Sequence, residues 1–503
     1  MAPRDFIANR KHAPHHLGRV LVLGLGKSGR AAVDYCLPLL GERVDVLAIA
    51  AGARTEASER FARTARAAGA LVAFEDDAVA SLAAEAGAPF DLCIASPGIS
   101  QFSAFYEAAA AASTEVVSEV EFAWRESAAD SRWVAVTGTN GKTTVCALCA
   151  HVLQEAGLAA AAVGNIGDPC IDAVAAGRTD VYVAEVSSYQ LASAKRFAPN
   201  VAVLLNITPD HLHWHRSFEA YRDAKLKLLA NLRTVPGAVA VLDATNDVVR
   251  AEVRRLRALP AAERGFAVVP LGTAAGIGGD MRAACGSDNA AFLDDGTLHV
   301  ALNGVSHTPL RADELRILGE HNASNALAVA AAVLALGASD EAVAAGLRSF
   351  APLEHRIEPC GTVAGVACYN DSKATNVDAT LKALAAFPAA HPIVLLGGDD
   401  KGTDLAPLVA AAHAHARAVV CFGAAGPRFA EAFEAAADGA PADFAVRRAA
   451  HLADALDAAL AGAAAGDVVL LSPACASFDE FGSFEERGTV FKSLVASHAS
   501  SGA

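Results

Sequence analysis

Short runs of apolar residues alternate with alanine-rich amphipathic segments along nearly the whole chain. Runs of this kind stand at residues 19–23, 181–184 and 392–396, and polar or glycine residues follow closely after each one. Apolar strands that alternate with helices are typical of parallel sheets covered by helices on both faces. The pattern therefore predicts an α/β protein with three consecutive domains and mainly parallel sheets, at residues 1–128, 129–351 and 352–503.

One stretch departs from this alternation. Between Val268 and Leu315 the helical pattern gives way to short strand-like runs with turns such as Asp294-Asp-Gly296. An Asp-Gly pair between short apolar runs indicates a hairpin. We expect an antiparallel extension of the central sheet in this stretch.

The composition narrows the class of protein. The chain has 503 residues, of which 53% are hydrophobic, and this is enough for several separate cores. Its net charge of −15 argues against nucleic acid or an anionic membrane as the main partner, because both require a basic surface. The N-terminus lacks an apolar signal core, and no apolar stretch approaches the ~18 residues of a membrane span. We expect a cytoplasmic protein, and we interpret its ten scattered cysteines as reduced structural thiols.

The segment Trp133-Val-Ala-Val-Thr-Gly-Thr-Asn-Gly-Lys-Thr-Thr144 carries the clearest chemistry. An apolar strand leads into a glycine-flanked turn, and a helix is expected from about Thr143. Backbone N–H groups of such a turn bind phosphate oxygens, Lys142 adds a positive charge, and the Thr143 hydroxyl can ligate Mg²⁺. Val136 stands where the common G-x-x-x-x-G-K-[ST] motif has its first glycine, so this turn is shorter than most. The segment predicts a triphosphate site, with a chance match on an ordinary strand-to-helix turn as the alternative.

A second glycine-rich turn, Gly24-Leu-Gly-Lys-Ser-Gly29, follows the first predicted strand. By itself it matches the G-x-G-x-x-G pattern of dinucleotide binding. The acidic residue expected after the next strand is absent, because that strand runs on into Ala51-Gly-Ala-Arg-Thr55, and this weakens a nicotinamide interpretation. Ser96-Pro-Gly98, after a later strand, is either an ordinary turn or a place where a ligand approaches the backbone.

Polar residues also follow two strands of the central domain. Glu185 stands at the end of one strand, and the strand that starts at Val201 reaches Asn206 and then His211. Ligands gather beyond the carboxyl ends of parallel strands. Thr143, Glu185 and His211 are therefore a candidate set of Mg²⁺ ligands, in which one imidazole accompanies oxygen ligands. Taken singly, Glu185 could instead be a surface carboxylate, and His211 could cap a turn.

Over essentially its full length the chain resembles the Mur ligase superfamily, and within it the branch that adds D-glutamate. The resemblance rests on the order and spacing of twelve motifs: Gly24-Leu-Gly-Lys-Ser-Gly29, Ser96-Pro-Gly-Ile99, Thr137-Gly-Thr-Asn-Gly-Lys-Thr-Thr144, Gly164-Asn-Ile-Gly167, Glu185-Val-Ser-Ser-Tyr-Gln-Leu191, Asn206-Ile-Thr-Pro-Asp-His-Leu212, Tyr221-Arg-Asp-Ala-Lys225, Gly319-Glu-His-Asn-Ala-Ser-Asn325, Glu354-His-Arg356, Asn370-Asp-Ser-Lys-Ala-Thr-Asn376, Gly397-Gly-Asp-Asp-Lys-Gly402 and Ser472-Pro-Ala-Cys-Ala-Ser-Phe-Asp479.

The resemblance implies Rossmann-like first and third domains and a central domain of P-loop type. It implies a monomeric enzyme that joins D-glutamate to UDP-N-acetylmuramoyl-L-alanine, with ATP as co-substrate and an acyl phosphate as intermediate. This reaction belongs to the cytoplasmic stage of bacterial peptidoglycan synthesis. The implied partners are these small molecules only.

The resemblance also implies roles for individual residues. The implied contacts of the UDP-sugar are Gly26, Lys27, Ser28, Ser96, Pro97 and Gly98. Those of ATP are Gly138, Thr139, Asn140, Gly141, Lys142, Thr143, Thr144, Asn322 and Asn325, with Arg356 and Asp371 added when the third domain closes. D-glutamate is implied to contact Thr375, Lys401, Ser477 and Phe484. The implied catalytic residues are Lys142, Asn165, His211 and Lys225, and the implied magnesium ligands are Thr143, Glu185, His211 and Lys225.

Lys225 needs a chemical change to fill that role. An ammonium beside Mg²⁺ in a partly buried site is strongly repelled. In the family the lysine reacts with CO₂ to give a carbamate, whose anionic oxygens suit Mg²⁺. The alternative is that Lys225 is a solvated helix lysine next to Lys227.

Some positions depart from the family pattern, and different functions stay open. His213 and Trp214 stand where an Asp-Arg pair is frequent, Asp400 replaces a frequent glycine before Lys401, and the common Asp near Ala51 is missing, so the uracil contacts are undefined. A nicotinamide dehydrogenase would use only the first glycine turn. A non-catalytic nucleotide-binding protein and a folate polyglutamate synthase are two further candidate functions.

Overall fold

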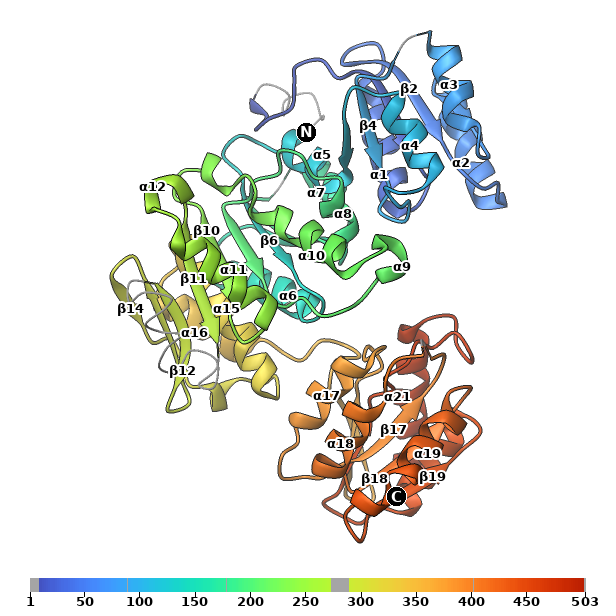
Figure 1. Ribbon diagram of the computed structural model, residues 1–503, viewed down its shortest axis with the longest axis vertical. Coiled ribbons are helices and arrows are strands. Elements are labelled where there is room, and N and C mark those ends of the chain that lie inside the picture. Colours follow the sequence, from blue (N-terminus) through green and yellow to red (C-terminus); the bar gives the residue numbers. More distant parts are fainter. Residues whose placement is uncertain (1–8, 88, 178, 273–288, 401, 502–503) are drawn as a thin grey trace. The chain divides into compact units, whose positions relative to one another are not determined.

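The computed structural model describes residues 9–87, 89–177, 179–272, 289–400 and 402–501 (Figure 1). Within these residues the strands form three sheets, of five, nine and six strands. The first sheet lies within residues 1–128, the second within 129–351 and the third within 352–503. The α/β class and the three-domain layout expected from the sequence are confirmed, and the domain boundaries themselves stay predictions.

The first sheet is parallel, with the order β3-β2-β1-β4-β5. Its strands are β1 (Gly18–Leu23), β2 (Val44–Ala50), β3 (Leu71–Ala73), β4 (Leu92–Ala95) and β5 (Val116–Ser118). Its helices are α1 (Lys27–Cys36), α2 (Glu56–Ala67), α3 (Ala78–Ala86), α4 (Ala104–Ala111) and α5 (Glu119–Glu126). The turn between β1 and α1 needs glycine, because a Cβ on Gly29 would lie 2.0 Å from the carbonyl oxygen of Gly24.

The second sheet has the order β14-β13-β12-β11-β10-β9-β6-β8-β7. Its strands are β6 (Arg132–Thr137), β7 (Ala160–Gly164), β8 (Val181–Glu185), β9 (Val201–Leu204), β10 (Val239–Asp243), β11 (Ala267–Gly272), β12 (Ala290–Asp294), β13 (Thr297–Leu302) and β14 (Val305–His307). The pairs β12·β13 and β13·β14 are antiparallel, which confirms the predicted extension. The accompanying helices are α6 (Lys142–Glu155), α7 (Cys170–Ala176), α8 (Ser188–Ala192), α9 (Leu212–His215), α10 (Phe218–Leu226), α11 (Asp247–Ala258), α12 (Ala261–Arg264), α15 (Glu320–Ala335) and α16 (Asp340–Ser349).

The third sheet has the order β15-β16-β20-β17-β18-β19, with the antiparallel strand β15 at one edge. Its strands are β15 (Glu358–Val363), β16 (Val366–Asn370), β17 (Ile393–Gly397), β18 (Ala418–Phe422), β19 (Ala445–Arg448) and β20 (Val468–Leu471). Its helices are α17 (Val377–Ala385), α18 (Ala406–His415), α19 (Gly426–Ala435), α20 (Leu452–Ala461) and α21 (Phe484–Ser501).

The burial along β17 shows how helices cover both faces of the third sheet. Val394 and Leu396 pack in one core cluster with Phe429 of α19, whereas Ile393 and Leu395 pack in another with Phe491 of α21. Successive side chains of a strand point to opposite faces, so a strand buried throughout requires a helical layer on each side.

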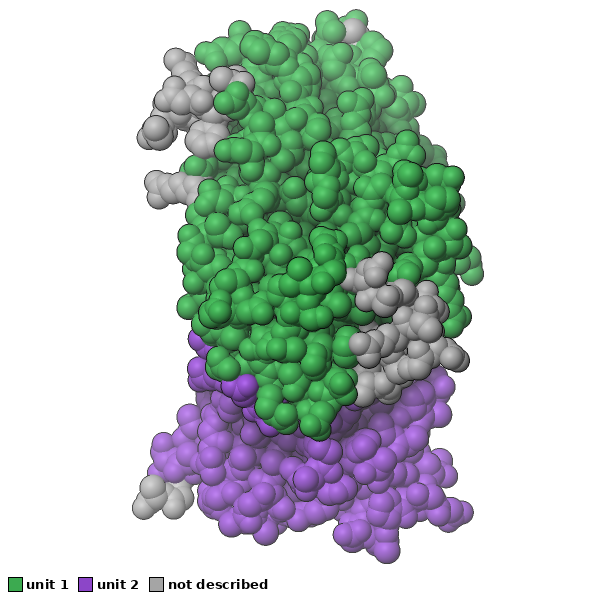
Figure 2. Space-filling view, turned by 90° about the vertical axis from the view of Figure 1, so that its left-hand side faces the viewer, with its two compact units in different colours: residues 1–312, 324–348 green, residues 313–323, 349–503 purple. Residues whose placement is uncertain are grey.

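The chain divides into two compact units, coloured separately in Figure 2. Unit 1 comprises residues 1–312 and 324–348 and holds the first two sheets; unit 2 comprises residues 313–323 and 349–503 and holds the third. No helix in the described part of the chain is long and apolar enough to span a lipid bilayer. The cysteines within that part are free thiols, and all of them except Cys360 are buried.

Candidate active site

The phosphate turn lies between β6 and α6, as the sequence predicts. Gly141 caps α6 in the left-handed region with φ +87°, and a Cβ there would lie 3.0 Å from Asn325 Oδ1. The left-handed backbone therefore favours glycine, and a larger residue would also be crowded by Asn325. Lys142 Nζ donates to the carbonyl oxygens of Gly138 and Thr139, both at 2.9 Å. The Lys142 ammonium thus lies over the turn, and the Asn325 side chain lies against Gly141 of the turn.

Two neighbouring residues hold the turn in shape. Asn206, just after β9, accepts a hydrogen bond from Asn140 N at 2.8 Å and donates to Asn140 O at 3.2 Å. Tyr221 of α10 is 2.8 Å from Thr139 through their hydroxyls. Sequence reasoning gave Asn206 and Tyr221 no role, although both stand in motifs of the family. These contacts fix the turn before any ligand arrives, which lowers the cost of binding.

Glu185 is a buried carboxylate with one oxygen available. Its side chain lies at the end of β8, and the residue is 2% exposed. Asn165 Nδ2 donates to Oε1 at 2.8 Å, whereas Oε2 is buried without a hydrogen-bond partner among the described residues. A buried carboxylate oxygen without a donor is costly unless a cation compensates it. The donor set therefore fits a hard cation, and Glu185 is not a surface carboxylate.

Lys225 is buried beside the same turn and is not the solvated lysine of the alternative interpretation. The residue is 2% exposed, and its Nζ donates to Gly138 O at 2.7 Å and to Thr137 Oγ1 at 3.4 Å. Burial, reinforced by the charge of Lys142, lowers the pKa of Lys225 well below its usual value of 10.5. A lowered pKa favours the neutral amine, and the neutral amine is the form that reacts with CO₂.

His211 stands at the start of α9 with a left-handed backbone, φ +54°. Its side chain is 43% exposed, with Nε2 3.6 Å from Asp210 Oδ2, and its ring centroid lies 4.9 Å from that of Tyr189. The structure joins Asn165 to Glu185, and Lys225 to the turn. The complete magnesium set of Thr143, Glu185, His211 and Lys225 stays a prediction.

A cavity of about 510 Å³ opens beside the first glycine turn. It is lined by all six residues predicted to contact the UDP-sugar, Gly26, Lys27, Ser28, Ser96, Pro97 and Gly98. The catalytic candidate Asn165 and its neighbours Gly164 and Gly167, from the loop after β7, also line it. Lys27 Nζ is 2.5 Å from the carbonyl oxygen of Gly167, and this contact joins the two loops. One cavity thus connects the first glycine turn with the residue that contacts Glu185.

In unit 2, Asp371 is buried at the end of β16. Its oxygens accept hydrogen bonds from Ser472 Oγ at 2.8 Å and from Ile357 N at 3.3 Å. Burial raises the pKa of Asp371 to about 7, although Arg356 and Arg487 oppose the rise. Arg356 and Asp371 are thus close enough to interact, as their common role implies.

Two of the candidate D-glutamate residues of unit 2, Ser477 and Phe484, stand next to segments tied to one buried arginine that the sequence analysis missed. Arg487 of α21 is 0% exposed, and it donates to Ser372 O, Cys475 O and Ala476 O at 2.9–3.1 Å. Ser372 Oγ donates to Phe484 O at 2.8 Å, and the Lys373 ammonium lies 3.7 Å from the Phe484 ring centroid. Ser477 is 2% exposed and directly follows Ala476. Thr375 lies in the same loop as Ser372. Lys401 lies outside the described residues.

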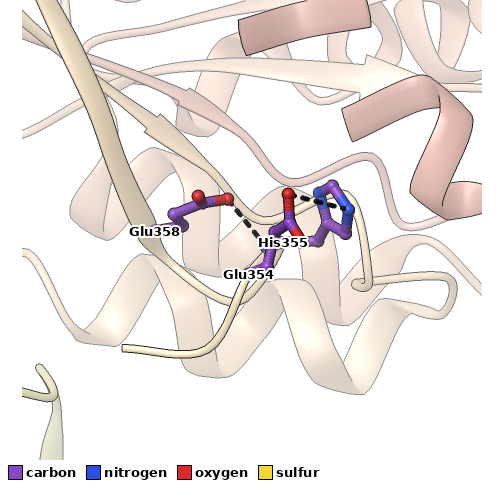
Figure 3. A group of neighbouring side chains, drawn as sticks. All are labelled: Glu354, His355 and Glu358. Carbon is purple, nitrogen blue, oxygen red and sulfur yellow. Dashed lines mark hydrogen bonds and ion pairs between the residues drawn. The ribbon is translucent and has the colours of Figure 1, made fainter. Parts of the chain in front are cut away.

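A group of ionisable side chains near the start of unit 2 is a structural network (Figure 3). Glu354, His355 and Glu358 have their ligand atoms within 4.8 Å of one another. Lys492 of α21 pairs with both carboxylates, and its Nζ lies 3.1 Å from Glu358 Oε1. His355 is buried and contacts Asn370 through Nδ1 at 2.9 Å. Lys492 therefore offsets part of the negative charge of the group within the protein.

Comparisons with known proteins agree with this geometry. Residues 136–333 match the Mur ligase middle domain, and residues 355–475 match the family described as Mur ligase, glutamate ligase domain. The UDP-N-acetylmuramoylalanine--D-glutamate ligase of Thermobifida fusca is 36% identical over 479 residues, which cover 94% of this chain and 97% of the relative.

The enzyme of the same name from Thermoanaerobacter pseudethanolicus is 36% identical over 408 residues, 81% of this chain and 84% of the relative. Among solved structures, MurF from Acinetobacter baumannii shares the fold with a TM-score of 0.53 at 19% identity, over 82% of this chain and 91% of its own. The identity to relatives across nearly the full length, together with the two matched domains, shows that the chain belongs to the Mur ligase family.

Proposed function

We propose that this protein is the MurD-type ligase, which adds D-glutamate to UDP-N-acetylmuramoyl-L-alanine at the expense of ATP during peptidoglycan synthesis. The main support for this proposal is the 36% identity, over 94% of the chain, to a relative named UDP-N-acetylmuramoylalanine--D-glutamate ligase. Enzymes of this kind require a site for a UDP-sugar, a site for a triphosphate and a site for an amino acid with two carboxylates.

The cavity beside Gly26 to Ser28 is the proposed UDP-sugar site. Its glycines leave the backbone open to a diphosphate, and Lys27 supplies a positive charge. Asn165 stands where this cavity reaches Glu185, so we assign the reacting carboxylate of the muramoyl-alanine to that end. A bound diphosphate explains the glycine turn without a nicotinamide cofactor.

The turn from Gly138 to Thr144 is the proposed site of the ATP phosphates. The helix N-terminus of α6 and Lys142 offer positive charge there, and Asn325 extends the site along α15. Asn322 is assigned to the same nucleotide through its place in the motif. Magnesium, held by Thr143, Glu185, His211 and Lys225, would offset charge on the transferring phosphoryl group.

We assign a carbamate to Lys225. The neutral amine nitrogen attacks the carbon of CO₂ and loses a proton, which converts a cation into an anionic oxygen ligand. The support is the burial of Lys225, its lowered pKa and its contact with Gly138 of the phosphate turn. A permanent ammonium at this place would repel a divalent cation.

In unit 2, Arg356 and Asp371 are assigned to ATP, and Thr375, Lys401, Ser477 and Phe484 to D-glutamate. The network of Arg487 fixes the loops that carry Ser372 and Ser477, which supports a binding role for them. Two bound carboxylates would orient the amine of D-glutamate towards its target.

The proposed reaction has two steps. A carboxylate oxygen of the muramoyl-alanine attacks the γ-phosphorus of ATP, ADP leaves, and an acyl phosphate forms. The neutral D-glutamate amine then attacks the acyl carbon and loses a proton, and the tetrahedral intermediate collapses to the amide as inorganic phosphate leaves. Lys142 stabilises the negative charge of the transferred group, while Asn165 and His211 hold the substrate carboxylate. We further propose that the enzyme acts as a monomer in the cytoplasm.

The deciding experiment is an assay of ADP release with UDP-N-acetylmuramoyl-L-alanine, ATP and a panel of amino acids. We expect D-glutamate to support release and L-glutamate to be much poorer, because a site that fixes both carboxylates presents the amine correctly for one configuration. Equal rates with both enantiomers would defeat the assignment. A folate polyglutamate synthase would instead use L-glutamate with a folate, and a dehydrogenase would change the absorbance of NAD(P)H.

A further inference from the structure

The one-turn helix α9 lies between two residues, His211 and Arg216, whose backbone conformations are unusual for residues other than glycine. His211 and Arg216, on either side of the turn, both have left-handed backbones, with φ +54° and +67°. Non-glycine residues are uncommon in this region, and two of them so close together are kept in place by the surrounding structure. The contacts that hold α9 therefore also decide where His211 points.

On one side, α9 is held by α8, the helix that follows β8 of the central sheet. The Tyr189 ring, from α8, stacks on Trp214 at 4.5 Å between centroids and lies 4.9 Å from His211. His215 is fully buried, with Nε2 2.9 Å from Ser188 Oγ. Ser188 and Tyr189 closely follow Glu185 along the chain. The strand end that presents Glu185 thus also provides the platform for α9.

On the other side, α9 is held by the loop that follows β4 of the first sheet. Ser100 Oγ donates to Trp214 O at 3.1 Å, and Arg216 Nη2 donates to Phe102 O at 2.9 Å. The Arg216 guanidinium also lies 4.6 Å from the Phe102 ring centroid. Residues 100–102 closely follow Ser96-Pro-Gly98, the turn that lines the cavity. Both partners of α9 therefore belong to the two ends of the proposed substrate site.

We propose that Trp214 and Arg216 are positioning residues, which make α9 a strut between the turn at Ser96–Gly98 and His211. The inference rests on the proposed function. A UDP-sugar bound at one end must present its carboxylate at the other end, and the strut fixes the separation. Because misplacement by about 1 Å can cost two orders of magnitude in rate, loss of the strut should lower kcat more than it lowers affinity.

The test compares Trp214→Ala, Trp214→Phe and Arg216→Ala with the wild type. Arg222→Ala is the matched control, because Arg222 is a partly exposed arginine of α10 that pairs with its neighbour Asp223. For Trp214→Ala and Arg216→Ala we expect kcat to fall at least about tenfold, while the Kd for UDP-N-acetylmuramoyl-L-alanine, measured by calorimetry without ATP, changes less than about threefold. Trp214→Phe keeps a ring for Tyr189 and should rescue most of the activity.

Tryptophan fluorescence gives a readout that does not depend on turnover. Trp124 and Trp133 are buried in the core, whereas Trp214 is half-buried on the substrate side. Addition of UDP-N-acetylmuramoyl-L-alanine should change the fluorescence of the wild type, and Trp214→Phe should abolish that change. This fluorescence change also separates the two hypotheses, because it needs binding and not turnover. A wild type that gives the change without ligase activity would refute the proposed function and leave the inference about α9 intact.

Several results would overturn the inference. Unchanged kcat in Trp214→Ala or Arg216→Ala would show that α9 is not a strut. A loss of affinity as large as the loss of kcat would make these residues binding contacts instead. The same fluorescence change in Trp214→Phe as in the wild type would show that substrate binding does not reach α9. Should Trp214→Ala fail to fold, Arg216→Ala and Trp214→Phe still decide between these results.

Discussion

Glu119 is a buried acid whose replacement should change how stability depends on pH. It starts α5, is 1% exposed, and accepts a hydrogen bond from Ile171 N at 2.7 Å at the start of α7. Burial raises its pKa from 4.5 to about 7, and nearby Asp172 adds to the rise. The perturbation is Glu119→Gln, which keeps the shape and an oxygen acceptor but cannot ionise.

The sign and size follow from the pKa of Glu119 in the folded and unfolded chain. Between pH 4.5 and about 7 the folded protein keeps a proton that the unfolded chain has already lost. The contribution of Glu119 to stability is therefore fully present below this window and is lost as the pH rises through it. The rise in pKa from 4.5 to about 7 corresponds to ~3 kcal/mol, which is an upper bound for the loss.

The assay is urea unfolding at pH 5, 6, 7 and 8, followed by tryptophan fluorescence, since Trp124 lies on the same helix. We expect Glu119→Gln to gain up to ~3 kcal/mol relative to the wild type between pH 5 and 8. Other groups with raised pKa, such as Glu126, are present in both proteins and cancel. Glu107→Gln, an exposed glutamate of α4, should follow the wild type. Parallel pH profiles for wild type and Glu119→Gln would refute the reasoning.

Two further predictions concern the phosphate turn. Lys142→Ala should lower turnover by at least about two orders of magnitude with an unchanged circular dichroism spectrum, because it removes charge stabilisation of phosphoryl transfer; near-normal turnover in the folded variant would make the turn merely structural. Lys225→Ala should be nearly inactive, and added formate or acetate should restore part of the ADP release by occupying the place of the carbamate. An unimpaired Lys225→Ala enzyme would exclude the carbamate.

The local elements of the fold were largely predictable, whereas contacts between distant segments were not. The phosphate turn, the glycine turn at Gly24 and the antiparallel extension each follow from a short pattern, since strand, turn and helix are set by nearby residues. Arg487 could not be found in this way, because its partner Ser372 lies 115 residues away. The stacking of Trp214 on Tyr189 likewise depends on how two segments meet.

Candidate site residues divide along the same line. Glu185 and Asn165 were each predicted from motifs, and the structure adds their hydrogen bond and the available oxygen Oε2. Sequence alone left Lys225 either solvated or carbamylated, because burial depends on residues from β6 and its turn. The structure settles its burial, which removes the first alternative. The roles of all candidate site residues stay predictions, those of Thr375, Lys401 and Asn322 included.

The place of Arg487 in the chain has a consequence for biosynthesis. This arginine belongs to α21, which follows every described strand of unit 2 along the chain, and yet it holds loops that follow β16 and β20. During synthesis, all the described strands of unit 2 leave the ribosome before Arg487 does, so the side chain that fixes those loops comes after the sheet. Domains fold as units during synthesis, so the loops at Ser372 and Ser477 gain their native arrangement only after α21 has emerged as well. A chain that ended before Phe484 would contain every described strand of unit 2 and would lack Arg487, which holds the loops of the candidate site.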